Sequence, residues 1–169
     1  RAHLCRSRIN SLIIYKGNQY ARFQSQNGKK ACIVKGFPQL HGFKSHPGFV
    51  RLIGHRGARG LMPENTMEGF EYTLDLGVMA LEFDVLLSKD NVPVITHDNY
   101  LSGAVTRDNN GNWLVVDGPN IKELTLSELK KFDVGGIDER SLYRECYPEQ
   151  KFLSGVRIPT LSELLELAG

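Results

Sequence analysis

The chain has 169 residues, of which 41% are hydrophobic and 24% charged, and its formal net charge is +2. This composition is typical of one globular domain and excludes disordered and collagen-like classes. No apolar run approaches the roughly 18 residues of a membrane-spanning helix, and the basic start lacks the apolar core of a secretory signal. The three cysteines, Cys5, Cys32 and Cys146, are far apart and suggest neither a disulfide framework nor a metal clip.

The charge is distributed unevenly along the chain. The first 50 residues contain nine Lys or Arg and no Asp or Glu, whereas the remainder contains twelve basic and all nineteen acidic residues. We therefore separate a basic segment, residues 1–49, from a domain at 50–169. A basic arm can bind nucleic acid or an anionic membrane surface, but basic runs are weak evidence and we expect no nucleic-acid partner. The segment's strand signals fall at Ser11–Tyr15, Tyr20–Phe23 and Ala31–Val34.

The first elements of the domain are a strand and a helix. Val50–Gly54 is a short apolar run followed by His55-Arg56-Gly57, which predicts a buried strand that delivers polar side chains to its carboxyl end. The run Pro63-Glu64-Asn65-Thr66 predicts the start of a helix, with Asn65 as its N-cap. Gly77 is expected to end that helix.

Val78–Leu87 is predicted as the second strand and contains two carboxylates. Glu82 and Asp84 are two residues apart, so they point to the same face of the strand. Two carboxylates on a confined face repel each other unless a cation lies between them, and a divalent metal is the natural compensator. The alternative is a carboxylate pair on a solvated strand face, which is common in antiparallel sheets.

A third apolar run, Val92–Thr96, leads to His97-Asp98. His55 and His97 thus both follow short apolar strands, where side chains converge on one end of a parallel barrel. Either histidine can act as an acid or a base near neutral pH. Arg56 offers a bidentate fork for a phosphate or carboxylate, and Gly57 lets the backbone approach an anion closely. Two such histidines can divide the roles of a general acid and a general base, and the residues leave open which histidine has which role.

These motifs together resemble the glycerophosphodiester phosphodiesterases. The resemblance rests on Gly54-His55-Arg56-Gly57-Ala58, Pro63-Glu64-Asn65-Thr66, Glu82-Phe83-Asp84-Val85, Val94-Ile95-Thr96-His97-Asp98 and Arg157-Ile158-Pro159-Thr160-Leu161. It implies a TIM-type (β/α) barrel with a small insertion after the second strand, and hydrolysis of glycerophosphodiesters to glycerol 3-phosphate and an alcohol. It also implies Mg²⁺ or Ca²⁺ held by Glu82 and Asp84, His55 and His97 as the acid/base pair, and Arg56 near the phosphate.

Residues 99–157 correspond to the insertion. Thr125-Leu126-Ser127-Glu128 predicts a capping box, and Thr160-Leu161-Ser162-Glu163 repeats the pattern at the last helix. Three aromatic residues of the insertion either form a rim that touches substrate or pack locally: Trp113, Tyr143 and Tyr147.

A complete barrel has eight strands and typically about 250 residues, whereas this sequence predicts two or three barrel strands after residue 50. We therefore expect an apparently truncated barrel that lacks the family's third metal-binding carboxylate. One hypothesis is the amino-terminal part of a metal-dependent phosphodiesterase; the other is an incomplete domain that binds anions or self-associates without turnover. Lysophospholipase D-type chemistry is a related alternative. The sequence indicates neither the compartment nor the oligomeric state.

Overall fold

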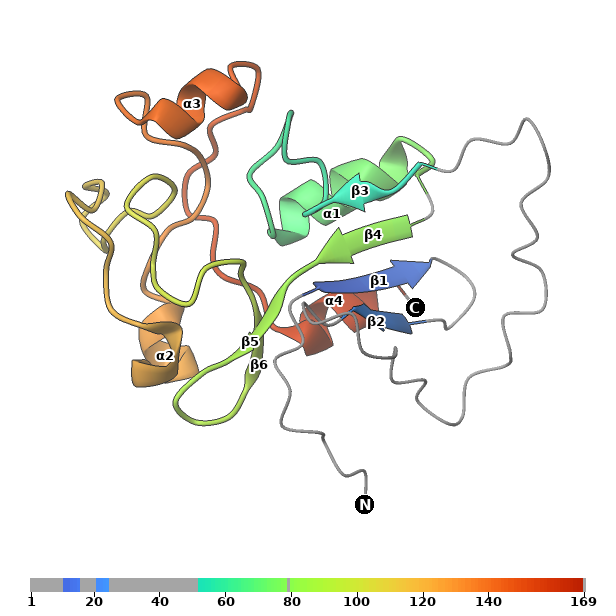
Figure 1. Ribbon diagram of the computed structural model, residues 1–169, viewed down its shortest axis with the longest axis horizontal. Helices are drawn as coiled ribbons and strands as arrows, with labels where there is room; N and C mark the ends of the chain where they lie inside the picture. Colours follow the sequence, from blue (N-terminus) through green and yellow to red (C-terminus); the bar gives the residue numbers. More distant parts are fainter. Residues whose placement is uncertain (1–10, 16–20, 25–51, 79, 169) are drawn as a thin grey trace.

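The computed structural model describes residues 11–15, 21–24, 52–78 and 80–168, and all structural statements concern these residues (Figure 1). The strands are β1 (Ser11–Tyr15), β2 (Ala21–Gln24), β3 (Gly54–His55), β4 (Ala80–Phe83), β5 (Val85–Leu87) and β6 (Pro93–Ile95). The helices are α1 (Met67–Asp75), α2 (Leu126–Leu129), α3 (Leu142–Cys146) and α4 (Leu161–Ala168), with one 3₁₀ turn, η1, at Ile121–Glu123. None of the helices in this part of the chain is long and apolar enough to span a membrane.

The main sheet has the strand order β2-β1-β4-β3. β3 and β4 run parallel, with His55 opposite Glu82, and α1 forms the connection between them. This βαβ unit confirms the α/β class, although the described residues do not form a closed barrel. β1 pairs antiparallel with the other edge of β4, and β2 pairs with β1 (Figure 1). Two of the strands expected in the basic segment are therefore confirmed in outline, while Ala31–Val34 lies outside the described residues.

The second domain strand is not continuous, which corrects the sequence analysis. It breaks at Asp84, and β5 pairs antiparallel with β6, with Val85 opposite Ile95. A turn at Asn91, whose φ is 61°, reverses the chain too soon for a parallel crossover. The expectation that His97 follows a parallel barrel strand was therefore wrong. His97 instead follows the second strand of a hairpin.

The start of α1 also differs from the prediction. Thr66, not Asn65, is the N-cap: its hydroxyl accepts a hydrogen bond from the Gly69 N–H at 3.1 Å and donates one to the Pro63 carbonyl at 2.7 Å. Asn65 has a left-handed backbone with φ 53°, whereas an N-cap residue is normally extended. Gly77 follows the end of the helix with φ 81°, as expected.

Two apolar cores meet at β6. Phe70 and Leu74 of α1 pack with β4 and with Leu164 of α4, and Ile95 belongs to this cluster. Val94 faces the second cluster, which is formed mainly by the chain beyond β6: Leu101, Ile121, Leu129 and Ile158. Neighbouring residues of a strand point to opposite faces, so β6 is fixed from both sides and holds the segment that follows it.

The two predicted capping boxes are present. In each, the threonine hydroxyl accepts from the backbone N–H of the glutamate, and the glutamate accepts from the backbone N–H of the threonine. They begin α2 at Thr125 and α4 at Thr160, and each satisfies backbone donors that a helix start leaves open.

Candidate active site

The loop from β3 to α1 lies tightly against α1. A Cβ at Gly54 would lie 2.5 Å from Cγ2 of Thr73, and one at Gly57 would lie 3.0 Å from the backbone of Gly69. Gly57 also has a φ of 79°, which favours glycine. The structure thus gives Gly57 a packing role, beyond the anion approach inferred from the sequence. The close contact fixes the residue before it, Arg56.

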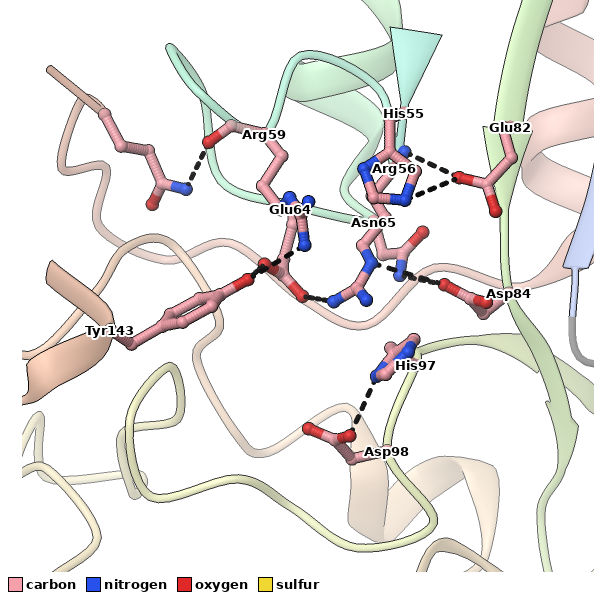
Figure 2. Close-up of polar contacts among 11 residues, drawn as sticks. His55, Arg56, Arg59, Glu64, Asn65, Glu82, Asp84, His97, Asp98 and Tyr143 are labelled. Carbon is pink, nitrogen blue, oxygen red and sulfur yellow. Dashed lines mark hydrogen bonds and ion pairs between the residues drawn. The ribbon is translucent and has the colours of Figure 1, made fainter. Parts of the chain in front are cut away.

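Arg56 is held by three acidic residues (Figure 2). Its backbone N–H donates to Oε2 of Glu82 at 3.0 Å, and its Nη1 donates to Oε1 of Glu64 at 2.7 Å. Its Nε lies 3.7 Å from Oδ2 of Asp84. Burial opposes the positive charge, but Glu64 and Asp84 outweigh burial and raise the pKa of Arg56. The guanidinium is therefore a fixed positive charge inside the site.

Glu82 lies in β4 and Asp84 at the break that follows this strand, and both side chains point toward the loop that carries Arg56 (Figure 2). Asp84 is only 7% exposed, and its Oδ2 accepts a hydrogen bond from Nδ2 of Asn65 at 3.2 Å. Burial, assisted by the charge of Glu82, raises the pKa of Asp84 despite this hydrogen bond. A bound cation relieves such a strained pair, so the donor chemistry fits a hard divalent ion. No group of three or more His, Cys, Asp or Glu placed to hold a metal occurs within the described ranges.

The two histidines approach this centre from different elements. His55 ends β3, and its Nε2 lies 3.7 Å from Oε2 of Glu82. His97 is brought in because the N–H of Thr96, just after the β5–β6 hairpin, donates to the carbonyl of Asp84 at 3.1 Å. In Figure 2 the Arg56 guanidinium and Asp84 lie between the two imidazoles.

The electrostatic surroundings of the histidines are opposite. Burial, followed by the nearby charge of Arg59, lowers the pKa of His55. The hydrogen bond to Asp98, whose Oδ1 lies 2.8 Å from Nδ1 of His97, raises the pKa of His97. The positive charge of Arg56 acts to lower the pKa of each histidine, although the hydrogen bond to Asp98 outweighs this effect at His97. Both imidazoles therefore lie within the electrostatic influence of the same guanidinium. The surroundings thus push the protonation equilibria of the two rings apart.

The structure brings together all five residues predicted for the site, His55, Arg56, Glu82, Asp84 and His97. It adds four that the sequence reasoning did not assign to it: Glu64, Asn65, Asp98 and Tyr143. Glu64, Asn65 and Asp98 lie within the motifs quoted in the sequence analysis, so their position in the sequence could have indicated that they belong to the site. Tyr143 had been predicted only as part of an aromatic rim or of local packing, and nothing in the sequence indicated its contact with Glu64, 79 residues away. Trp113, in contrast, packs locally, with its ring centroid 6.3 Å from that of Phe152.

A pocket opens beside His97. Its polar lining includes Glu64, Asn65 and Asp98, and its apolar lining includes Ile95 and Ile158. Glu64, His97 and Asp98 therefore border the same small space as residues of the segment 99–157, among them Tyr100 and Gln150.

The fold is of the α/β class, and the site places an arginine beside two carboxylates and two histidines. The family model of the glycerophosphoryl diester phosphodiesterase family matches residues 55–169, and the chain belongs to that family. A glycerophosphodiester phosphodiesterase of Caldanaerobacter subterraneus subsp. tengcongensis is 38% identical over 118 residues, which cover 70% of this chain and 40% of the relative. One of Bacillus subtilis is 32% identical over 126 residues, covering 73% and 38%.

Solved structures agree with this assignment. A Silicibacter pomeroyi structure named for the glycerophosphoryl diester phosphodiesterases has a TM-score of 0.71 and 53% identity, covering 73% of this chain and 42% of that one. An Oleispira antarctica phosphodiesterase in complex with the product sn-glycerol 3-phosphate has a TM-score of 0.50 and 36% identity, covering 70% and 40%. This chain thus spans about two fifths of the length of these relatives.

Proposed function

We propose that this chain carries the acid/base and phosphate-binding part of a metal-dependent glycerophosphodiester phosphodiesterase. The reaction is hydrolysis of a glycerophosphodiester to glycerol 3-phosphate and an alcohol. The observation that supports it most is the placement of Arg56 between two histidines and beside two carboxylates (Figure 2). For the whole protein we propose a TIM-type barrel, in which β3, α1 and β4 supply one βαβ unit and residues 99–157 an insertion.

Glu82 and Asp84 are the proposed ligands of Mg²⁺ or Ca²⁺. Such an ion, when bound, supplies positive charge to the nonbridging oxygens of the phosphodiester. Arg56 adds its own charge and donors to the same oxygens. Its Nη1 donates to Glu64 and its Nε faces Asp84 at 3.7 Å, which hold the guanidinium in one orientation.

His55 and His97 are the proposed proton carriers. One ring accepts the proton of the nucleophile, a water molecule or a substrate hydroxyl, while the other gives a proton to the leaving alkoxide. The two imidazoles lie on either side of the guanidinium in Figure 2, as an attack and a departure on opposite sides of phosphorus require. We assign the acid and base roles to His55 and His97 together, without deciding which histidine has which role.

The test is release of glycerol 3-phosphate from glycerophosphocholine by the purified 169-residue chain, with Mg²⁺, with Ca²⁺ and with EDTA. We expect release with metal, loss of release with EDTA, and a decrease of at least about 100-fold in the His97→Ala variant. Release that is indifferent to EDTA and to His97→Ala would overturn the assignment. A folded chain that binds glycerol 3-phosphate without any release would favour the alternative of an anion-binding domain without turnover.

A further inference from the structure

Helix α3 of the segment 99–157 contacts the loop that carries Arg56. The hydroxyl of Tyr143, in α3, donates a hydrogen bond to Oε2 of Glu64. The other oxygen of the same carboxylate, Oε1, accepts from Nη1 of Arg56 at 2.7 Å. Figure 2 shows Tyr143, Glu64 and Arg56 in one line toward Asp84. A residue distant in sequence is thus one carboxylate away from the phosphate-binding group.

Two further hydrogen bonds dock the two segments beside this contact. Nε2 of Gln150 donates to the carbonyl of Arg59 at 2.7 Å, and the N–H of Lys151 donates to the carbonyl of Leu61 at 2.9 Å. Nη1 of Arg59 lies 3.4 Å from the Tyr143 hydroxyl. Tyr143 therefore meets a loop that is already held in place, and its hydroxyl bond orients Glu64 within that loop.

Tyr143, Glu64 and Arg56 form a chain of hydrogen bonds in which the hydroxyl and the guanidinium donate and the carboxylate accepts. Burial and the charge of Glu64 raise the pKa of Tyr143, so its phenol stays protonated and donates at neutral pH. A carboxylate bonded at both oxygens cannot rotate freely, and it fixes one end of the planar guanidinium. The other nitrogens of Arg56 then keep one direction.

We propose that Tyr143 is a positioning residue of the phosphate site, which acts through Glu64 to orient the guanidinium of Arg56. The segment 99–157 thereby completes the site as well as bordering it. This inference deepens the proposed function and rests on it for the identity of the anion.

The first test measures the hydrogen exchange of the Arg56 side chain in the absence of any ligand. In the whole chain, the ¹⁵Nε–H resonance of Arg56, assigned with Arg56→Lys, should exchange with water several-fold faster in Tyr143→Phe than in the wild type. The matched control is Tyr147→Phe, because Tyr147 stacks edge-on against Tyr143 with ring centroids 5.1 Å apart and its hydroxyl makes no hydrogen bond within the described part of the chain. Unchanged exchange in Tyr143→Phe, or an equal increase in Tyr147→Phe, would overturn the proposal.

The second test measures the affinity for sn-glycerol 3-phosphate by calorimetry. Tyr143→Phe should raise the Kd about fivefold, the order expected for one lost hydrogen bond to a charged group. In a Glu64→Ala background, which removes the carboxylate that Tyr143 contacts, the same substitution should have no further effect, since Tyr143 acts through Glu64. A full effect in that background would contradict the proposal. If the wild type does not bind glycerol 3-phosphate, the proposed function fails, while the exchange of Arg56 still decides the role of Tyr143.

Discussion

Asp98 distinguishes the two histidines at the scale of single residues. Its carboxylate lies 2.8 Å from Nδ1 of His97, whereas the acidic neighbour of His55, Glu82, lies 3.7 Å from Nε2. A carboxylate at hydrogen-bond distance favours the charged imidazole and fixes which nitrogen carries a proton.

Asp98→Asn should therefore lower the pKa of His97. The raised pKa means that protonation of His97 stabilises the fold fully below the unfolded pKa of about 6.5, and that this stabilisation is lost as the pH rises through the folded pKa. The variant should reduce that pH dependence. Titration of the imidazole Cε1–H resonances measures the shift, with His55 as the internal reference. An unchanged pKa of His97 would refute the role given to Asp98, because Arg56 and Asp84 would then set it.

Glu82→Gln should weaken binding of Ca²⁺ and Mg²⁺ by about tenfold or more, since a neutral amide replaces one of two carboxylates and hard cations prefer charged oxygen ligands. Calorimetric titration of the chain with each ion measures this. The control is Glu149→Gln, an exposed carboxylate outside the site. Equal affinities of the wild type and both variants would remove Glu82 from the ligand set.

Residue types alone could not distinguish the roles of Asn65 and Thr66. Both are good N-cap residues, so the sequence permitted either as the start of α1. The structure assigns the cap to Thr66 because its backbone is extended, while the left-handed Asn65 turns its amide to Asp84. That the five predicted residues lie close together could be anticipated from the sequence, because they lie in or directly after short apolar runs. The contact between Tyr143 and Glu64 could not be predicted, since only the folded loop brings the two residues together.

At the scale of elements, the β3–α1 loop depends on one glycine and tolerates change at another. Gly57→Ala places a Cβ 3.0 Å from the backbone of Gly69 at a φ of 79°, and should cost about 1–3 kcal/mol of unfolding free energy. Gly60→Ala meets no atom within 4 Å and should change stability by less than about 1 kcal/mol. Urea denaturation compares the two. Equal stabilities would show that the loop is not pressed against α1.

The β5–β6 hairpin shows where sequence patterns are insufficient. Val92–Thr96 is apolar, as a buried parallel strand would be, and its two faces do bury Val94 and Ile95. What decides the pairing is the reversal at Asn91, a feature of backbone geometry rather than of apolar pattern. The hairpin nevertheless brings His97 toward Asp84, because Thr96 bonds the Asp84 carbonyl, so the predicted proximity did not depend on the strand direction.

At the scale of the whole molecule, β1 covers the edge of β4 opposite β3. An uncovered strand edge presents unpaired backbone donors and acceptors to other chains. Deleting residues 1–25 should therefore give a larger apparent mass in light scattering after gel filtration than the intact chain has. Ile13→Pro, which removes one backbone N–H from β1 without shortening the chain, should act in the same direction. If the deletion variant had the same number of chains per particle as the intact protein, this role of β1 would be contradicted.

The basic segment and the domain were separated by composition, yet the structure joins them through one sheet. Charge patterning carries no information about strand pairing, so the contact between β1 and β4 could not be predicted. The family, in contrast, was predictable, because its motifs fall within residues 54–98 and 157–161, and the family model covers 55–169.

The most direct test of the account is a titration of the isotope-labelled chain with sn-glycerol 3-phosphate in the presence of Ca²⁺. We expect the imidazole resonances of His55 and His97 and the guanidinium resonance of Arg56 to shift together along one binding curve, and Arg56→Lys to weaken this binding. Binding that leaves these three resonances unchanged, or no binding by the folded chain, would contradict the central claim that they form one phosphate site.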